Sequence, residues 1–192
     1  MSKLYFFNSV MNSGKSAHII MQVYNLQEKG KNVLILKPSL DTREFGKISS
    51  RALNTELEAK LIYTAKDIVK YVEEVKPDII FVDEANFLTA DEIETLAYVV
   101  DNLNIPIHCY GLMLDFKSNL FEGSKRLVEL ADTVRELKSP CSKCNKKATH
   151  HLRKINGNYV FSGEVIQVGD MDEYESVCRK CFMQAKTDFG GN

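Results

Sequence analysis

The fold is decided close to the N-terminus, by the stretch Leu4-Tyr5-Phe6-Phe7-Asn8-Ser9-Val10-Met11-Asn12-Ser13-Gly14-Lys15-Ser16. Its first four residues are apolar and predict a short buried strand, and the small and polar residues that follow predict a turn. A helical pattern of apolar residues begins at Lys15. Strand, small-residue turn, Gly-Lys-Ser and helix form the layout of a phosphate-binding loop, in which backbone N–H groups and the positive end of the helix dipole face an anion.

In such a loop Lys15 would reach the β- and γ-phosphates of a nucleotide, and the hydroxyl of Ser16 would ligate Mg²⁺. The predicted nucleotide contacts are Ser9, Val10, Met11, Asn12, Ser13, Gly14, Lys15 and Ser16. The full motif has glycine five residues before Gly14, where this chain has Ser9. Taken alone, the stretch could also be a polar turn with an exposed lysine, so other parts of the chain have to decide.

The composition is that of an ordinary globular protein, with 44% hydrophobic and 27% charged residues among 192. The net charge of −1 provides no global basic field that would draw the chain onto nucleic acid or an anionic membrane. The N-terminus leads directly into a strand, and no apolar run approaches the about 20 residues of a membrane span. We therefore predict a cytoplasmic protein that binds neither nucleic acid nor membrane.

Helical and strand-like patterns alternate through the first 138 residues. Apolar spacing predicts helices at residues 15–29, 64–76, 89–103 and 124–131, and apolar runs predict strands at 4–7, 32–36, 61–63, 79–82, 106–110 and 134–137. The polar segment 39–60 lacks periodicity and is predicted to be a long loop, as is the segment 111–123. The alternation predicts a P-loop, RecA-like α/β domain over residues 1–138, with helices flanking a parallel sheet.

The character of the chain changes after Pro140, where the periodic helices are predicted to stop and short strands to form at 159–161 and 165–168. Four of the five cysteines form two C-x-x-C pairs here: Cys141, Cys144, Cys178 and Cys181. Four thiolates in two turns are the closed ligand set of a structural Zn²⁺, whereas redox or unpaired thiols are the alternatives. We predict a small zinc-ribbon domain over residues 139–192, whose metal holds the base of a long loop.

Two carboxylates, Asp83 and Glu84, follow the apolar run at residues 79–82. Ligands of parallel α/β sheets bind beyond the carboxyl ends of the strands, so Asp83 is expected beside the phosphate loop as a Walker B residue. Neighbouring residues of a strand point to opposite faces, which would leave Glu84 free to accept a proton from a hydroxyl or water nucleophile. A solvated pair at a strand end is the alternative.

Phe116 and Phe121 lie in a segment predicted near the carboxyl edge of the sheet and could enclose a flat ring, although core packing explains them equally well. His150 and His151 could be spare metal ligands, but we expect them to line the loop or the site. The remaining cysteine, Cys109, is predicted to be a small buried hydrophobe.

Together these residues resemble the cytosolic, type II thymidine kinase family over nearly the whole chain. The resemblance rests on the order and spacing of several motifs: Met-Asn-Ser-Gly-Lys-Ser ending at Ser16, Asp41-Thr42-Arg43, Asp83-Glu84-Ala85-Asn86-Phe87, Tyr110-Gly111-Leu112, Asp115-Phe116, Leu120-Phe121-Glu122-Gly123-Ser124, and the cysteine pairs with Gly169 and Tyr174 between them. It implies ATP- and Mg²⁺-dependent phosphorylation of the 5′-hydroxyl of thymidine to dTMP, a step of pyrimidine salvage for DNA synthesis. It also implies a homotetramer that is inhibited by dTTP.

The resemblance implies roles for individual residues. The catalytic set would be Glu84 as general base, Lys15 on the phosphates and Arg43 near the transferring phosphoryl group, with Asp83, Ala85 and Asn86 completing the ATP and Mg²⁺ contacts. Met11, Leu112, Phe116 and Phe121 match positions around the base. The cysteine-anchored loop is similar to the family's lasso, which grips the pyrimidine with groups near Val168, Gly169 and Tyr174.

Three residues depart from the family pattern. Ser9 replaces the first glycine, Asn86 stands where many members have glutamine, and His151 takes a lasso position that is often threonine and is a candidate base contact. Two other functions share parts of the pattern, a zinc-ribbon P-loop ATPase acting on nucleic acid and a nucleotide-binding scaffold. The near-neutral charge disfavours the first, and a base candidate beside a metal-binding aspartate disfavours the second.

Overall fold

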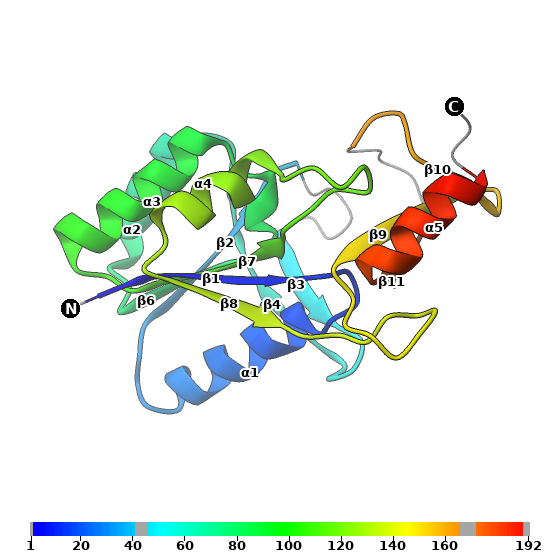
Figure 1. The fold of residues 1–192 in the computed structure, drawn as a ribbon. Coiled ribbons are helices and arrows are strands. Elements are labelled where there is room, and N and C mark those ends of the chain that lie inside the picture. Colours follow the sequence, from blue (N-terminus) through cyan, green and yellow to red (C-terminus); the bar gives the residue numbers. More distant parts are fainter. Residues whose placement is uncertain (1, 41–45, 166–171, 190–192) are drawn as a thin grey trace.

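A six-stranded sheet forms the centre of the larger of two lobes in the computed structural model, which describes residues 2–40, 46–165 and 172–189 (Figure 1). The sheet has the strand order β5-β2-β6-β7-β1-β8. Its strands are β1 (Leu4–Ser9), β2 (Val33–Pro38), β5 (Lys60–Ile62), β6 (Ile79–Val82), β7 (Ile107–Leu112) and β8 (Thr133–Leu137). All neighbouring strands pair in parallel, so their carboxyl ends lie along one edge, which faces the smaller lobe (Figure 1).

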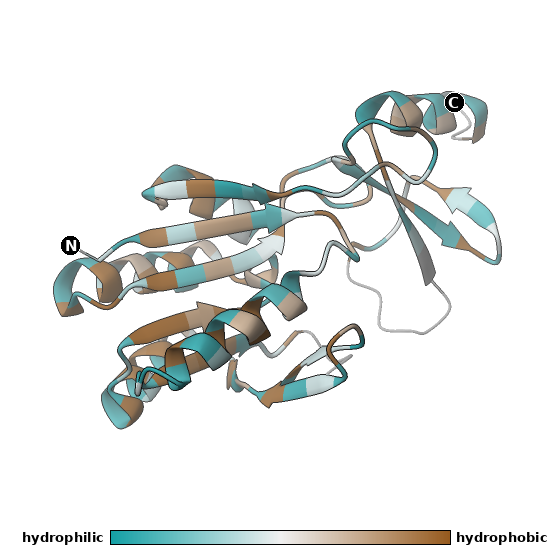
Figure 2. Ribbon diagram, turned by 90° about the horizontal axis from the view of Figure 1, so that it is seen from below, coloured by the Kyte–Doolittle hydropathy of each residue, from teal (hydrophilic) through white to brown (hydrophobic). Residues whose placement is uncertain are grey.

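Helices cover both faces of this sheet. Helix α1 (Lys15–Gln27) lies on one face, and α2 (Ala65–Val75), α3 (Ala90–Leu103) and α4 (Glu122–Leu130) lie on the other (Figure 1). Each face packs its own buried hydrophobic cluster, and Figure 2 shows hydrophobic residues interspersed with hydrophilic ones along the strands and helices. This arrangement confirms the predicted α/β fold with a parallel sheet between helices.

A capping box is present at the start of α3. The hydroxyl of Thr89 accepts the backbone N–H of Glu92 at 3.3 Å, and the Glu92 carboxylate accepts the N–H of Thr89 at 2.8 Å. These bonds satisfy N–H groups that the first helical turn cannot satisfy itself. Among the described residues, none of the helices is both long enough and apolar enough to cross a membrane.

The segment 39–60 is not the uniform loop that its composition predicts. It contains an antiparallel hairpin of β3 (Lys47–Ser50) and β4 (Thr55–Glu58). Ile48 is fully buried in the hydrophobic cluster that includes residues of α1. A single apolar residue on each four-residue strand, Ile48 on β3 and Leu57 on β4, leaves too little periodicity to reveal a hairpin. Strand β7 likewise continues to Leu112, inside the second predicted loop, because Leu112 pairs with Ser9 of β1.

The smaller lobe contains a three-stranded antiparallel sheet of β9 (His150–Ile155), β10 (Asn158–Val160) and β11 (Asp172–Val177), in the order β10-β9-β11. Helix α5 (Arg179–Phe189) buries Phe182 and Ala185 among Leu152, Val177 and the cysteines. The prediction that helices stop after Pro140 was therefore wrong. Two buried positions in a short, charged helix make a weak pattern, and its apolar partners are distant in sequence.

Two strands were predicted between the cysteine pairs. The one at residues 159–161 corresponds to β10, displaced by one residue. The other, at 165–168, is not present at Val165, which lies in a bend, and the rest of it falls outside the described residues.

Candidate functional site

The phosphate loop joins the end of β1 to the start of α1. Gly14 immediately precedes the helix with φ 83°, a left-handed backbone that strains any residue with a side chain. Ser9, the position where the motif has glycine, is the last residue of β1 and lies outside the left-handed region. Its hydroxyl donates to the carbonyl of Val10 at 3.1 Å. The backbone at position 9 therefore does not require glycine.

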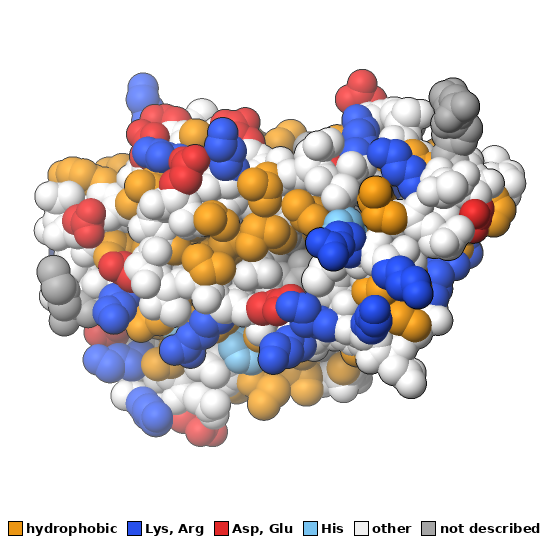
Figure 3. All heavy atoms as spheres, in the orientation of Figure 1, with side chains coloured by type: hydrophobic (Ala, Val, Ile, Leu, Met, Phe, Trp, Pro, Cys, Tyr) orange, Lys and Arg blue, Asp and Glu red, His pale blue; other side chains and the backbone are white. Residues whose placement is uncertain are grey.

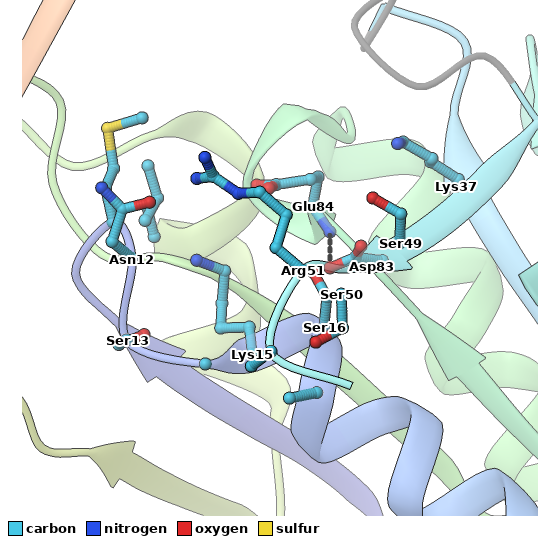
Figure 4. A pocket seen from close by; sticks show the side chains of 15 residues that line it. Asn12, Ser13, Lys15, Ser16, Lys37, Ser49, Ser50, Arg51, Asp83 and Glu84 are labelled. Carbon is cyan, nitrogen blue, oxygen red and sulfur yellow. Dashed lines mark hydrogen bonds between the residues drawn. The ribbon is translucent and has the colours of Figure 1, made fainter. Parts of the chain in front are cut away.

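A cavity of about 520 Å³ opens at the carboxyl edge of the sheet. It is lined by residues 11–17 of the phosphate loop and α1, Lys37 of β2, residues 49–52 of the hairpin, Asp83 and Glu84 after β6, and Leu112 of β7. Figure 4 shows Lys15, Arg51 and Glu84 extending toward the same open region from three different elements. The predicted meeting of the phosphate loop and the two carboxylates is thus present in the structure.

Asp83 is buried at the floor of this cavity, with 3% of its surface exposed. Its carboxylate accepts the backbone N–H of Glu84 at 3.0 Å, the dashed line in Figure 4. Burial, reinforced by the negative charge of Glu84, raises the pKa of Asp83 to about 7, although Lys15 and Lys37 oppose this rise. The cations of the protein do not fully compensate this carboxylate, so a divalent cation beside it would favour its ionised form.

Glu84 owes its orientation to a turn and not to strand alternation, because β6 ends at Val82 and both carboxylates lie beyond it. Its backbone is left-handed, with φ 50° and ψ 38°, which costs a non-glycine residue about 1–2 kcal/mol. One carboxylate oxygen, Oε2, is buried and has no hydrogen-bond partner among the described residues. A strained backbone together with an unsatisfied, buried carboxylate oxygen, in a residue that lines a cavity, is typical of a functional residue.

The four paired cysteines form the predicted cluster in the smaller lobe. All four Sγ atoms lie within 4.8 Å of one another, and Cys144 Sγ lies 3.7 Å from that of Cys178 and 3.8 Å from that of Cys181. Four thiolates bound to zinc at about 2.3 Å in a tetrahedron are separated by about 3.8 Å. The cluster therefore has the donor set and the spacing to hold a metal ion.

Comparison with known proteins identifies the family. The sequence profile described as thymidine kinase matches residues 2–182 of this chain. The chain belongs to the thymidine kinase family. Thymidine kinases of Streptococcus agalactiae (serotype Ia) and Streptococcus pyogenes (serotype M28) are each 44% identical to it over 183 residues, which cover 94% of this chain and 96% of each relative. The resemblance inferred from the sequence motifs is confirmed, and the chain is a kinase.

Two basic residues at this kinase cavity were missed by the sequence reasoning. Lys37 is only 1% exposed, and its ammonium group donates to the carbonyl of Lys47 at 3.1 Å. Arg51 extends into the cavity from the hairpin turn (Figure 4). A lysine at the end of an otherwise apolar strand was the available signal for Lys37, whereas Arg51 is placed by the unpredicted hairpin. Arg43, the predicted phosphoryl-contacting arginine, lies outside the described residues.

Ala85 and Asn86 do not line the cavity described above. Both are buried in the short helix η1 (Ala85–Phe87), where the Asn86 side-chain oxygen accepts the N–H of Leu112 at 3.0 Å. A Cβ atom at Gly111 would lie 2.9 Å from Asn86, so the close approach of η1 to β7 requires glycine there. In this structure Asn86 positions the end of β7 and makes no side-chain contact with the cavity.

The four residues predicted to surround the base lie in different environments. Met11 and Leu112 line the cavity. Phe116 is buried, and the guanidinium carbon of Arg153 in the smaller lobe lies 4.9 Å from its ring centre. Phe121 meets Phe87 edge to face at 5.6 Å. The two predicted ring-stacking phenylalanines therefore have different aromatic or cationic partners in this structure.

The remaining predicted residues of the smaller lobe have mixed outcomes. Tyr174 lies in β11, opposite Arg153 of β9, whereas Val168 and Gly169 lie outside the described residues. His150 contacts Thr149 and the ring of Phe182, and neither histidine belongs to the thiol cluster. Cys109 is fully buried, as predicted, and burial raises the pKa of its thiol.

Proposed function

We propose that this kinase transfers the γ-phosphoryl group of ATP to the 5′-hydroxyl of thymidine and releases dTMP and ADP. The observation that carries the proposal is the unpartnered Oε2 of Glu84, buried at a cavity that also contains Lys15 of the phosphate loop. An anion-binding loop with an unsatisfied carboxylate beside it suits phosphoryl transfer to a hydroxyl group. Family membership supports thymidine as the acceptor.

In this mechanism the backbone of residues 12–16 and the Lys15 ammonium group bind the phosphates of ATP. The hydroxyl of Ser16 and the carboxylate of Asp83 would hold Mg²⁺. The Asp83 carboxylate suits such a cation because it is buried and the positive charges of Lys15 and Lys37 do not offset its burial. When bound, Mg²⁺ neutralises charge on the phosphate oxygens. Arg51 and Arg43 are further candidates to stabilise the charge of the transferring group, with Arg51 supported by its position at the cavity.

Glu84 would act as the general base. As the 5′-oxygen of thymidine forms a bond to the γ-phosphorus, Oε2 accepts the hydroxyl proton. The bond between the γ-phosphorus and its bridging oxygen breaks at the same centre, and ADP leaves with that bonding electron pair. The strained turn at Glu84 keeps this carboxylate at the cavity before the substrate arrives.

We further propose that the four cysteines bind a structural Zn²⁺ and thereby hold the base of a thymidine-binding lasso. Val168, Gly169 and Tyr174 would contact the pyrimidine, and Met11, Leu112, Phe116 and Phe121 would surround it. The division into residues 1–138 and 139–192 remains a prediction from the sequence. The homotetramer and inhibition by dTTP rest on the family resemblance, and the cytoplasmic location remains a prediction from the sequence.

The alternative of an ATPase acting on nucleic acid has less support. On the face drawn in Figure 3, Lys and Arg lie on both lobes and are interrupted by acidic and hydrophobic side chains. Nucleic-acid affinity depends on basic groups that follow a phosphate backbone. Incubation with ATP, Mg²⁺ and thymidine should yield dTMP and ADP in equal amounts. Hydrolysis of ATP that is stimulated by single-stranded DNA, without any dTMP, would instead support the alternative.

A further inference from the structure

Two facing side chains of the smaller lobe bind both backbone polar groups of one phosphate-loop residue, Met11. His151 of β9 and Ser176 of β11 are directly opposite each other in the antiparallel sheet. The Nε2 atom of His151 accepts the N–H of Met11 at 3.0 Å, and the Ser176 hydroxyl donates to the Met11 carbonyl at 2.9 Å. These two bonds cross 140 and 165 residues of sequence to connect the lobes.

The contact restrains two successive peptide planes. The N–H of Met11 belongs to the peptide that joins it to Val10, and its carbonyl belongs to the peptide that joins it to Asn12. In a trans peptide the N–H points opposite to the carbonyl, so the Ser176 bond directs the Asn12 N–H away from Ser176. Met11 and Asn12 both line the cavity, and the backbone between β1 and Gly14 is therefore oriented from the other lobe.

The His151 ring is in a neutral form that can accept the N–H of Met11. Its side chain is 2% exposed, and burial, followed by the charge of Lys15, lowers its pKa to about 4. The backbone of Leu114 opposes part of this lowering of the pKa. A neutral imidazole has one ring nitrogen that accepts, and this nitrogen receives the Met11 N–H. His151 thus connects the smaller lobe to the phosphate loop.

We propose that His151 and Ser176 form a latch on Met11 through which the cysteine-anchored lobe orients the phosphate loop for phosphoryl transfer. His151 is then a positioning residue, and its ring is engaged by the backbone of Met11. The proposal rests on the proposed reaction in the Lys15–Glu84 cavity, because it assigns the latch to the loop that binds the donor nucleotide. It replaces the prediction that His151 contacts the base.

Four variants test the latch in pairs. His151→Leu removes the acceptor, whereas His151→Gln retains a side-chain oxygen at comparable reach and an amide donor. Ser176→Ala removes the hydroxyl, whereas Ser176→Thr retains it. Thr187→Val is the matched control, because it removes a hydroxyl that bonds only to the Met183 carbonyl within α5. The readouts are the Kd of a non-hydrolysable ATP analogue, kcat, the KM for each substrate and zinc content.

We expect His151→Leu and Ser176→Ala to lose about 10- to 100-fold in kcat/KM for ATP, because misplacing a reacting group by about 1 Å has effects of this size. The analogue should bind more weakly, zinc content should be unchanged, and the Gln and Thr variants should recover most of the loss. Thr187→Val should match the wild type. If His151→Leu does not fold, the two Ser176 variants alone test the latch. Ser176→Ala lacks only one hydroxyl of the wild type, and Ser176→Thr retains that hydroxyl.

Two results would overturn the latch. One is normal binding of the ATP analogue by His151→Leu and Ser176→Ala, with only the thymidine KM raised, which would make His151 a base contact. The other is an equal loss in the Leu and Gln variants while folding and zinc content are intact. Analogue binding requires no acceptor substrate, so the latch can fail or hold independently of whether the wild type produces dTMP.

Discussion

The two lobes are stabilised in different ways. The larger lobe buries two hydrophobic clusters, one on each face of its sheet, and helices cover both. Among the described residues, the cluster of the smaller lobe has six buried hydrophobic members, and two of them are the cysteines Cys141 and Cys178. A core of that size stabilises little structure, and small lobes of this kind depend on a metal. The comparison places the phosphate loop and the carboxylate pair on the larger lobe, whereas the proposed metal would stabilise the smaller one.

The largest expected effect is a loss of kcat when the proposed general base of the larger lobe is replaced. Glu84→Gln should lower kcat by about 10²- to 10⁴-fold, because the amide cannot accept the proton of the 5′-hydroxyl. Binding of the ATP analogue and zinc content should remain near wild type, as measured by calorimetry and metal analysis. Glu73→Gln, an exposed change on α2, is the control. A Glu84→Gln enzyme that retains most of its kcat would remove Glu84 from the proposed mechanism.

The second largest effect is expected on removal of the proposed metal, which should affect the smaller lobe more than the larger one. Removing the metal with a chelator should disorder the smaller lobe and raise the thymidine KM at least about tenfold, because thiolate coordination stabilises the folded lobe. Limited proteolysis should then cleave within residues 139–192 while the larger lobe resists. Restoring Zn²⁺ should restore the KM. Simultaneous loss of both lobes would mean that they form one cooperative unit, and unchanged kinetics in metal-free enzyme would exclude the proposed lasso role.

The third effect concerns Lys37, whose charge lowers the pKa of Asp83. In Lys37→Met that opposing charge is lost, so the pKa of Asp83 should rise above about 7. In the proposed mechanism ionised Asp83 holds Mg²⁺, so the acid limb of the kcat/KM profile should move to higher pH, on the order of one unit. Lys47→Met, which removes an exposed ion pair with Glu56, is the control and should leave the profile in place.

The smallest effect concerns the pH dependence of stability. His151 has a folded pKa of about 4, below its usual 6.5, so the unfolded state binds more protons between these two values. The free energy of unfolding should therefore fall as pH decreases from 6.5 to 4, by at most about 1.4 kcal/mol per pH unit from this group. Urea titrations should give a smaller slope for His151→Gln. Identical slopes would show that His151 does not have the lowered pKa in the folded state.

The sequence predicted the fold of the larger lobe well for a specific reason. Five of the six strands of the central sheet are short, largely apolar runs, β8 being the exception, and the helices that flank the sheet repeat apolar residues on one face. Such patterns arise within a single element, so they are visible without knowledge of the partner. The β3–β4 hairpin and α5 were missed because Ile48, Phe182 and Ala185 have meaning only beside their distant neighbours.

The residues of the candidate site likewise fall into two groups, those that the sequence predicted and those that it did not. Gly14, Lys15, Asp83, Glu84 and the four cysteines belong to motifs whose spacing already indicates phosphate, carboxylate and metal chemistry. Lys37 and Arg51 join the cavity from segments with no motif. The turn at Glu84, which replaces the expected strand alternation, depends on where β6 ends.

Local patterns in the sequence by themselves determined the helices and strands of the α/β architecture, the phosphate loop, the carboxylate pair and the two C-x-x-C pairs, because each depends on residues close together in the chain. Only the tertiary structure decided that His151 and Ser176 bind Met11, and that Asn86 positions β7 instead of facing the cavity. These contacts join segments 26 to 165 residues apart. Their geometry results from how the lobes and strands pack, and no local pattern records it.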